Sequence, residues 1–145
     1  MPGTPPEIVI ALHACDTATD DALAGAIAWG SKVVLAAPCC QHDLQAQLDR
    51  RDPPLGFASL VQHGIVRERL GDLLTDTARA DVLAARGYRT DVIEFVAGEH
   101  TAKNLMIRAV ATGQPDAGAA ARLDDLMTRW GIRPAIIDRL DGVGA

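Results

Sequence analysis

The hydrophobic residues of this chain gather in two short runs, residues 8–12 (Ile-Val-Ile-Ala-Leu) and residues 33–37 (Val-Val-Leu-Ala-Ala). Runs of aliphatic residues without polar alternation are typical of strands covered on both faces, as in parallel sheets. The residues between the runs are enough for one helix, which we expect to end at Gly30. Three residues can cap its start: Asp16, Thr17 and Thr19. The pattern therefore predicts a strand–helix–strand unit with parallel strands.

Helical spacing follows this unit. Residues 41–50 are predicted to form a short amphipathic helix, and residues 52–56 (Asp-Pro-Pro-Leu-Gly) break the chain. Residues 66–86 carry apolar positions at helical spacing and predict a long helix that ends at Gly87. Four charged residues of that helix are expected on a solvated face: Arg67, Glu68, Arg69 and Asp72.

Two further strands are predicted over residues 89–96 and 105–110. Their connection is too short for a crossover helix, so we expect an antiparallel hairpin. The fold class is therefore α/β: two parallel strands plus an antiparallel hairpin, with helices on both faces of the sheet. Two small helices, over 117–130 and 134–140, are expected to form a helical tail (residues 112–145) behind a main domain (residues 1–111).

Polar residues follow both apolar runs at the point where each predicted strand ends. His13-Ala14-Cys15-Asp16 follows the first run and Pro38-Cys39-Cys40-Gln41-His42 follows the second. Ligands of open α/β sheets bind beyond the carboxyl ends of the strands. The sequence therefore predicts a functional site where these two segments meet.

Composition limits the function classes. The 145 residues suffice for one domain with its own core, and the net charge of −5 argues against this chain alone gripping a phosphate backbone, although nucleic acid stays possible as a partner. No apolar run approaches the roughly 20 residues that cross a bilayer, so we expect no membrane association. Three cysteines, two of them adjacent, favour a reducing compartment, and we expect a cytoplasmic protein.

Three blocks of this sequence resemble a family of methyltransferase domains. They are His13-Ala14-Cys15-Asp16-Thr17-Ala18-Thr19-Asp20, Pro38-Cys39-Cys40 and Lys103-Asn104-Leu105-Met106-Ile107. The family includes glutathione S-transferase C-terminal-domain-containing and methyltransferase-like proteins, and the resemblance covers roughly residues 7–111. It implies a class I, Rossmann-like methyltransferase that uses S-adenosylmethionine as its cofactor. No glycine-rich turn after a strand is present, so the chain resembles the carboxyl-terminal portion, the substrate-side half of such a sheet.

The resemblance also implies roles for individual residues. Catalytic roles fall on His13, Asp16, Pro38 and Cys39. The cofactor is expected to contact His13, Ala14 and Cys15. The methyl acceptor is expected to contact Cys40, His42, Glu99, His100, Lys103 and Asn104. Each has a plainer interpretation: Asp16 as a helix cap, the cysteines as small buried hydrophobes, and Lys103-Asn104 as a turn.

A metal site is the competing interpretation of the same residues. Thiolate and imidazole suit zinc, and Cys15, Cys39, Cys40, His13 and His42 can converge at neighbouring strand ends. Structural zinc ligands are usually paired two to four residues apart, and adjacent cysteines do not easily chelate one ion. We therefore expect no metal and keep a small metal-binding protein as an alternative.

The predicted function is methyl transfer from S-adenosylmethionine to an unidentified acceptor: an RNA base, a protein side chain or a small molecule. The alternative is a non-catalytic interaction module derived from a methyltransferase. Residues 8–12 are expected to be an interior strand of the intact fold, so in this chain their outer edge would be open. That edge predicts pairing with a missing amino-terminal half, self-association, or poor solubility.

Overall fold

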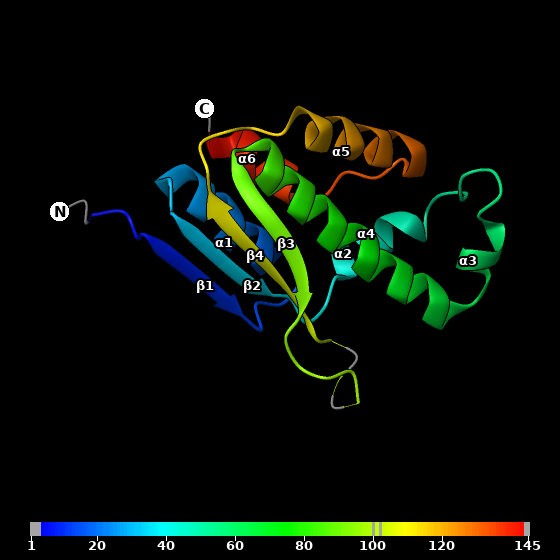
Figure 1. The fold of residues 1–145 in the computed structure, drawn as a ribbon. Coiled ribbons are helices and arrows are strands. Elements are labelled where there is room, and N and C mark those ends of the chain that lie inside the picture. The colour runs from blue at the N-terminus through cyan, green and yellow to red at the C-terminus, as the bar shows by residue number, and fades with distance from the viewer. Residues whose placement is uncertain (1–3, 100, 102, 144–145) are drawn as a thin grey trace.

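The structure is a computed structural model that describes residues 4–99, 101 and 103–143. Its centre is a four-stranded sheet in the order β1-β2-β4-β3 (Figure 1). The strands are β1 (Ile8–Leu12), β2 (Val33–Ala37), β3 (Tyr88–Glu94) and β4 (Leu105–Ala111). β1 and β2 are parallel, and β4 lies antiparallel between β2 and β3. The α/β class, the parallel pair and the antiparallel hairpin are confirmed.

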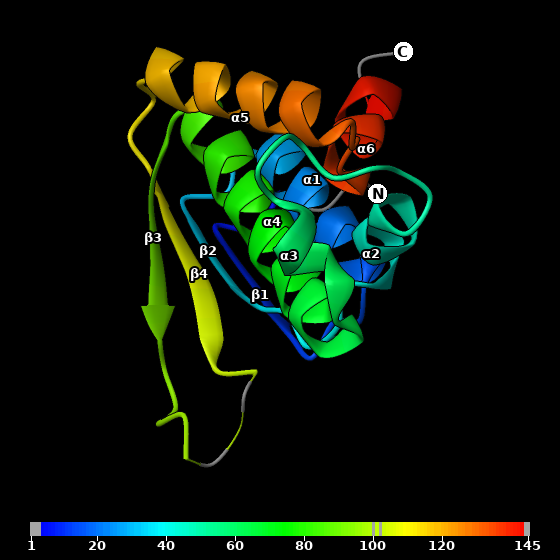
Figure 2. The same cartoon turned by 90° about the vertical axis from the view of Figure 1, so that its right-hand side faces the viewer.

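Helices of the described chain lie on one face of this sheet (Figure 2). They are α1 (Thr17–Trp29), α2 (His42–Leu48), α3 (Ala58–Gln62), α4 (Gly64–Ala85), α5 (Ala117–Trp130) and α6 (Ala135–Val143). α1 and α4 contact the strands directly, α5 packs on α4, and α6 packs on α1. The expected helices on the second face are not found among the described residues. Strands β1, β2 and β3 progress across the sheet in one direction, and right-handed crossovers then place both connecting helices on the same side.

The core consists of alternate strand residues packed against these helices. Ala11, Val34, Ala36, Ile107 and Ala109 face Leu23 of α1, Leu83 of α4 and Ile136 of α6, all at most 8% exposed. A second cluster joins α2, α4 and the end of α5, with Leu44, Leu48, Leu74 and Trp130 at its centre. The last two helices thus contribute to the same core as the sheet, while the division at residue 111 stays a prediction.

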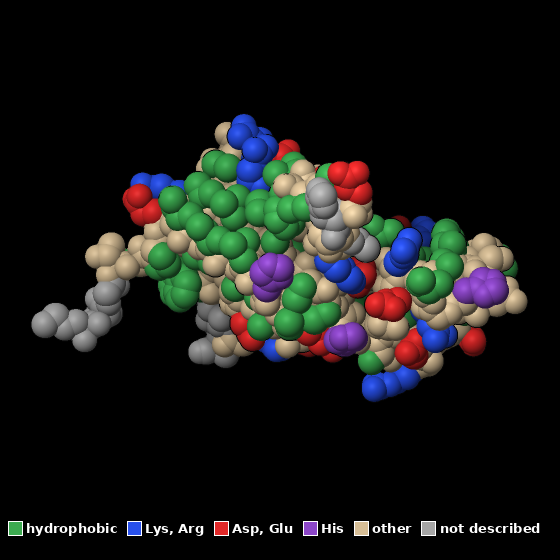
Figure 3. Space-filling view, turned by 90° about the horizontal axis from the view of Figure 1, so that it is seen from below, with side chains coloured by type: hydrophobic (Ala, Val, Ile, Leu, Met, Phe, Trp, Pro, Cys, Tyr) green, Lys and Arg blue, Asp and Glu red, His purple; other side chains and the backbone are tan. Residues whose placement is uncertain are grey.

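The opposite face of β1 is open. Ile8, Ile10 and Leu12 are 57%, 60% and 56% exposed, although Ala11 between them is buried. β1 also pairs only with β2 and forms the edge of the described sheet. The expectation that this strand is covered on both faces is therefore wrong for the described residues, whereas the open outer edge expected for this chain is confirmed. Seen from below, hydrophobic side chains gather on the side where the N-terminal segment emerges (Figure 3).

Helix ends follow the residues that favour them. α1 ends at Gly30 (φ 65°) and α5 at Gly131 (φ 62°), both in the left-handed conformation that glycine adopts without strain. α5 begins at Asp116, whose carboxylate accepts hydrogen bonds from the backbone N–H groups of Gly118 (2.8 Å) and Ala119 (3.1 Å). No helix in the described part of the chain has the length and apolar character to span a bilayer.

Candidate functional site

The segments that follow β1 and β2 lie side by side at one edge of the sheet. The His13 N–H donates to the Ala37 carbonyl at 3.2 Å, and the Asp16 N–H donates to the Cys40 carbonyl at 3.0 Å. These bonds continue the pairing of β1 with β2 beyond the last strand residues. The predicted meeting of the two polar segments at the carboxyl edge is therefore present.

The segment after β1 is held in an uncommon backbone conformation. His13 (φ 54°) and Asp16 (φ 50°) adopt the left-handed region, which costs a non-glycine residue on the order of 1–3 kcal/mol. Such strain persists only where surrounding contacts compensate for it. The contacts are those of Asp16 with Cys40, with α2 and with α4.

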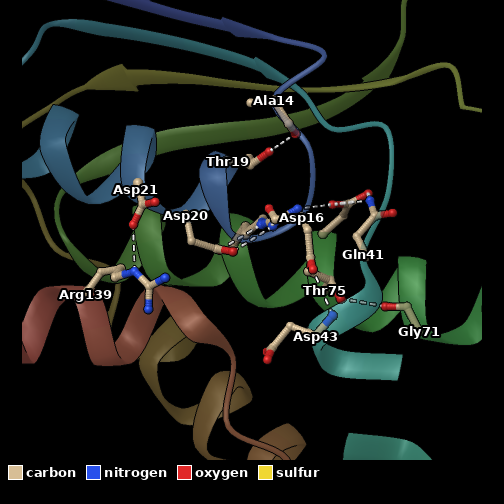
Figure 4. A network of polar contacts seen from close by, with 12 residues as sticks. Ala14, Asp16, Thr19, Asp20, Asp21, Gln41, Asp43, Gly71, Thr75 and Arg139 are labelled. Atoms are coloured by element: carbon tan, nitrogen blue, oxygen red, sulfur yellow. Dashed lines mark hydrogen bonds and ion pairs between the residues drawn. The ribbon is translucent and has the colours of Figure 1, made fainter. Parts of the chain in front are cut away.

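The Asp16 carboxylate accepts a hydrogen bond from the start of α2 and does not cap α1. Asp16 stands at the N-cap position of α1, but its side chain makes no capping bond there. Its Oδ1 accepts a hydrogen bond from the Asp43 N–H at 3.0 Å, at the start of α2 (Figure 4). The expected capping of the helix after β1 is therefore wrong for the Asp16 side chain. The positive φ of Asp16 and the hydrogen bond of its side chain to Asp43 together hold the loop after β1 against the segment after β2.

A buried arginine supports this edge from α4. Arg79 is 1% exposed and donates to both Asp20 oxygens (2.9 and 2.8 Å), to Asp76 Oδ1 (3.2 Å) and to the Asp16 carbonyl (2.8 Å). Burial by itself would lower the pKa of Arg79, but the hydrogen bonds and charges of Asp20 and Asp76 outweigh it, and the pKa is raised. The guanidinium is thus permanently charged and fixes the loop after β1 through its backbone.

Gln41 connects the segment after β2 to the same group. Its Nε2 donates to both oxygens of Asp76, at 3.2 and 3.1 Å, and Gln41 is 4% exposed. Burial raises the pKa of Asp76 above its ordinary value, although Arg79 and Gln41 act in the opposite direction. The Oε1 atom of Gln41 is buried and has no hydrogen-bond partner among the described residues.

The sequence interpretation did not include this network. The sequence feature that could have indicated this network lies in α4, where Asp76 and Arg79 share the buried helix face with Ala78 and Val82. Charged residues at apolar positions of a helical pattern indicate a buried ion pair. The partner Asp20 lies 59 residues away and cannot be assigned from spacing alone.

A pocket of about 590 Å³ opens beside Pro38 and Gln41, between α4 and the β3–β4 hairpin. Lys103 of the hairpin forms an ion pair with Asp72 of α4 across this region. Three of the four residues expected on a solvated face also line this pocket, and two of them, Glu68 and Arg69, are exposed. The lining residues are Pro38, Gln41, Ile65, Glu68, Arg69, Asp72, Leu73, Asp76, Gly98, Lys103 and Leu105.

The hairpin residues predicted to bind the acceptor divide into two groups. Lys103 lines the pocket, whereas Asn104 donates to Glu94 Oε1 (2.6 Å) and to the Val96 carbonyl (3.0 Å) and so braces the hairpin. Glu99 is exposed in the connecting loop. His100, also predicted at this site, lies outside the described residues.

The three cysteines lie together at the same edge. Cys15 Sγ is 3.2 Å from Cys39 Sγ, and Cys39 Sγ is 3.8 Å from Cys40 Sγ. All three are free thiols, with Cys15 exposed and the other two partly buried. The expectation that adjacent cysteines do not easily chelate one ion is therefore not supported by the positions of these sulfur atoms.

The other predicted site residues lie around this thiol group. His13 is exposed at the tip of the loop, and His42 is exposed at the first residue of α2. Ala14 offers its carbonyl to the Thr19 hydroxyl at 2.6 Å, so its backbone is engaged within the loop. The catalytic, cofactor-binding and substrate-binding roles of these residues stay predictions.

Part of this edge is similar to a known family of proteins. Residues 2–47 match a family described as "Methyltransferase domain". The matched segment contains β1, α1, β2 and both loops that carry the thiol group, and it covers less than half of the chain. No curated protein and no solved structure matches the chain. The match supports a methyltransferase domain and, in general terms, methyl transfer.

Proposed function

We propose that this edge is the acceptor side of a methyltransferase site that uses S-adenosylmethionine. The observation that carries the proposal is the pocket of about 590 Å³ at the carboxyl edge, beside the loop that follows β2. Its walls come from three elements far apart in sequence, which is typical of ligand sites in open α/β sheets. The family match over residues 2–47 gives the reaction class.

The residues present fit only part of a donor site. The loop at His13, Ala14 and Cys15 offers exposed atoms at the carboxyl edge, consistent with one wall. No described strand is followed by a glycine-rich turn that opens a helix, which a nucleotide-binding site of this type uses. S-adenosylmethionine would supply an electrophilic methyl group, and the chain's own contribution is on the acceptor side.

That contribution is orientation of the acceptor and removal of its proton. Pro38 fixes the backbone φ at the pocket wall, and the Lys103–Asp72 ion pair supplies both signs of charge for polar groups of the acceptor. His13 presents an exposed imidazole at the same edge of the sheet, and imidazole is the side chain that most often accepts a proton in catalysis. Asp16 is a positioning residue, because its carboxylate holds α2 in place.

The acceptor class is proposed from pocket size. Small-molecule sites generally measure about 300–1,000 Å³, and the pocket falls within that range. A small molecule, or a single side chain or base inserted from a larger acceptor, matches this volume. An extended nucleic-acid surface is less favoured by the net charge of −5.

Methyl incorporation tests the proposal. The chain is incubated with S-adenosylmethionine carrying a labelled methyl group and with protein, RNA and small-molecule fractions of a cell extract. We expect label in one fraction, lost in His13→Ala and retained in His63→Ala, a control in the turn before α4. Calorimetry with S-adenosylmethionine and its demethylated product accompanies the assay. No binding heat at millimolar ligand together with no incorporation overturns the proposal for this chain.

We also propose a second copy of the chain as the partner of β1. The open edge carries unpaired backbone groups next to the exposed Ile8, Ile10 and Leu12. Pairing of two such edges would satisfy the backbone groups and cover apolar surface at once. An amino-terminal half of a methyltransferase domain is the competing occupant.

A further inference from the structure

We propose that Cys15, Cys39 and Cys40 form a thiolate site for one Zn²⁺ ion, with a fourth coordination position open to solvent. The three Sγ atoms all lie within 4.8 Å of one another. They come from the two loops that the His13–Ala37 and Asp16–Cys40 backbone hydrogen bonds hold together. The site is therefore organised by the fold and not by the spacing of the cysteines in the sequence.

The sulfur positions match the size of a zinc–thiolate site. With Zn–S bonds of about 2.3 Å and tetrahedral angles, two thiolate ligands stand about 3.8 Å apart. The Cys39–Cys40 separation is 3.8 Å, the Cys15–Cys39 separation of 3.2 Å needs to widen by about 0.6 Å, and the third pair lies within 4.8 Å. Cys15 belongs to an exposed loop, so a rotation of its side chain suffices.

Zn²⁺ suits these ligands better than a hard cation does. Thiolates are soft ligands, and no carboxylate oxygen or imidazole nitrogen of the described residues belongs to this ligand group. Binding replaces three thiol protons by the metal ion: three S–H groups lose H⁺, three Zn–S bonds form, and no electron is transferred. The fourth position is left for water, as in sites that remain chemically open.

The surroundings leave a path for the ion. Cys15 is exposed and both other cysteines are partly exposed, so the ion can enter from solvent without unfolding of the loops. The cluster also contains every cysteine of the chain, three in all. Any thiolate–metal signal from this protein must therefore arise here.

Spectroscopic titration with Co²⁺ tests the site in reduced protein. Co²⁺ replaces Zn²⁺ in thiolate sites and gives a sulfur-to-cobalt charge-transfer band together with the visible bands of tetrahedral cobalt. We expect these bands to saturate at one Co²⁺ per chain and to vanish when Zn²⁺ is added. Calorimetry in buffers of different ionisation enthalpy should show that Zn²⁺ binding releases protons, because cysteine binds the metal as thiolate.

Single substitutions assign the ligands. Cys15→Ser, Cys39→Ser and Cys40→Ser should each weaken Zn²⁺ binding on the order of 100-fold or more, since loss of even a supporting group around a metal costs 10–100-fold. His63→Ala is the matched control, because an exposed histidine binds metal adventitiously, and it should leave the affinity unchanged. Circular dichroism of each variant confirms that it is folded.

Two results would overturn the assignment. One is the absence of a sulfur-to-cobalt band in the reduced wild-type chain, a measurement that needs no variant. The other is unchanged affinity in folded Cys40→Ser, which would leave only Cys15 and Cys39. The readouts are independent of methyl transfer, so this site and the proposed function succeed or fail separately.

Discussion

At the scale of single residues, the best-buried charge of the described chain lies beneath the candidate site. Removing a guanidinium from water costs several kcal/mol, and only close partners with good geometry compensate for that cost. Arg79 has such partners in two carboxylates and one carbonyl, and two of these bonds are the parallel pair to Asp20. The arginine therefore couples the packing of α1 on α4 to the shape of the loop after β1.

Loss of this guanidinium should strongly destabilise the protein. In Arg79→Ala, Asp20 and Asp76 would remain buried without their cation, which typically costs about 3–5 kcal/mol of unfolding free energy. Arg129→Ala is the matched control, because its ion pair with Asp125 is more than half exposed and is screened by solvent, so its loss should cost much less. Denaturant unfolding of both variants measures the difference. Equal losses of unfolding free energy in the two variants would show that the buried network stabilises the protein no more than an exposed ion pair does.

Asp76 should make stability depend on pH in an unusual direction. Its pKa is raised on folding, chiefly by burial, so the folded state binds a proton more tightly than the unfolded state does. The contribution of Asp76 is therefore most favourable below the unfolded pKa of about 3.9 and declines as pH rises through the higher folded pKa. Most ion-paired aspartates behave in the opposite way.

The measurement is the unfolding free energy of wild type and Asp76→Asn across a pH series. The asparagine does not titrate, so the wild-type value minus the variant value should fall as pH rises from about 4, the unfolded pKa of the carboxyl group. Asp20→Asn is the companion variant that keeps Asp76 in place. A difference that rises with pH would mean that Arg79 outweighs burial at Asp76.

At the scale of elements, local sequence signals predict most helices and strands, and they predict the functional site less completely. β1 and β2 have the predicted bounds, and α5 runs over residues 117–130 as expected, because apolar runs, glycine ends and a capping aspartate are local signals. α3 escaped prediction, since its five residues bury none of their side chains and leave no periodic pattern. The hairpin was predictable, but the insertion of β4 between β2 and β3 depends on long-range pairing.

The candidate site shows the same limit. The ends of β1 and β2 could be located from sequence, because strand ends in α/β sheets are where ligands bind. The proximity of the three sulfur atoms could not, since it depends on side-chain directions in loops with left-handed residues. The pocket wall from α4 also required knowledge of which helix face turns toward the hairpin.

The start of α5 allows a test of how much a single capping residue stabilises its helix. Asp116→Ala removes the acceptor of two backbone N–H groups, and loss of such a cap costs typically about 1 kcal/mol. Asp124→Ala, exposed within the same helix, is the control and should change stability by no more than about 0.5 kcal/mol. Thermal unfolding reports both values. A cost at Asp124 equal to that at Asp116 would mean that charge, rather than capping, is responsible.

At the scale of the whole molecule, the two faces of the sheet differ, because β1, β2 and β3 follow one another across it in one direction. Helices cover one face, which supplies the core, and leave the other face bare (Figure 2). The side chains of the bare face differ from strand to strand. On β3 and β4 the bare face carries the Asp91–Arg108 ion pair at 2.9 Å, which tolerates water. On β1 it carries three aliphatic side chains beside an unpaired edge. The apolar area and the open edge thus coincide on one strand.

That coincidence predicts self-association through β1. Sedimentation velocity over a range of concentrations should show a dimer, and Ile10→Glu should shift it toward monomer, because charge on this 60% exposed position opposes burial and edge pairing. Leu55→Glu is the matched control: Leu55 is fully exposed in the loop before α3, so the same change of chemistry there should leave the dimer intact. A wild-type chain that sediments as a monomer at every concentration contradicts the second-copy proposal.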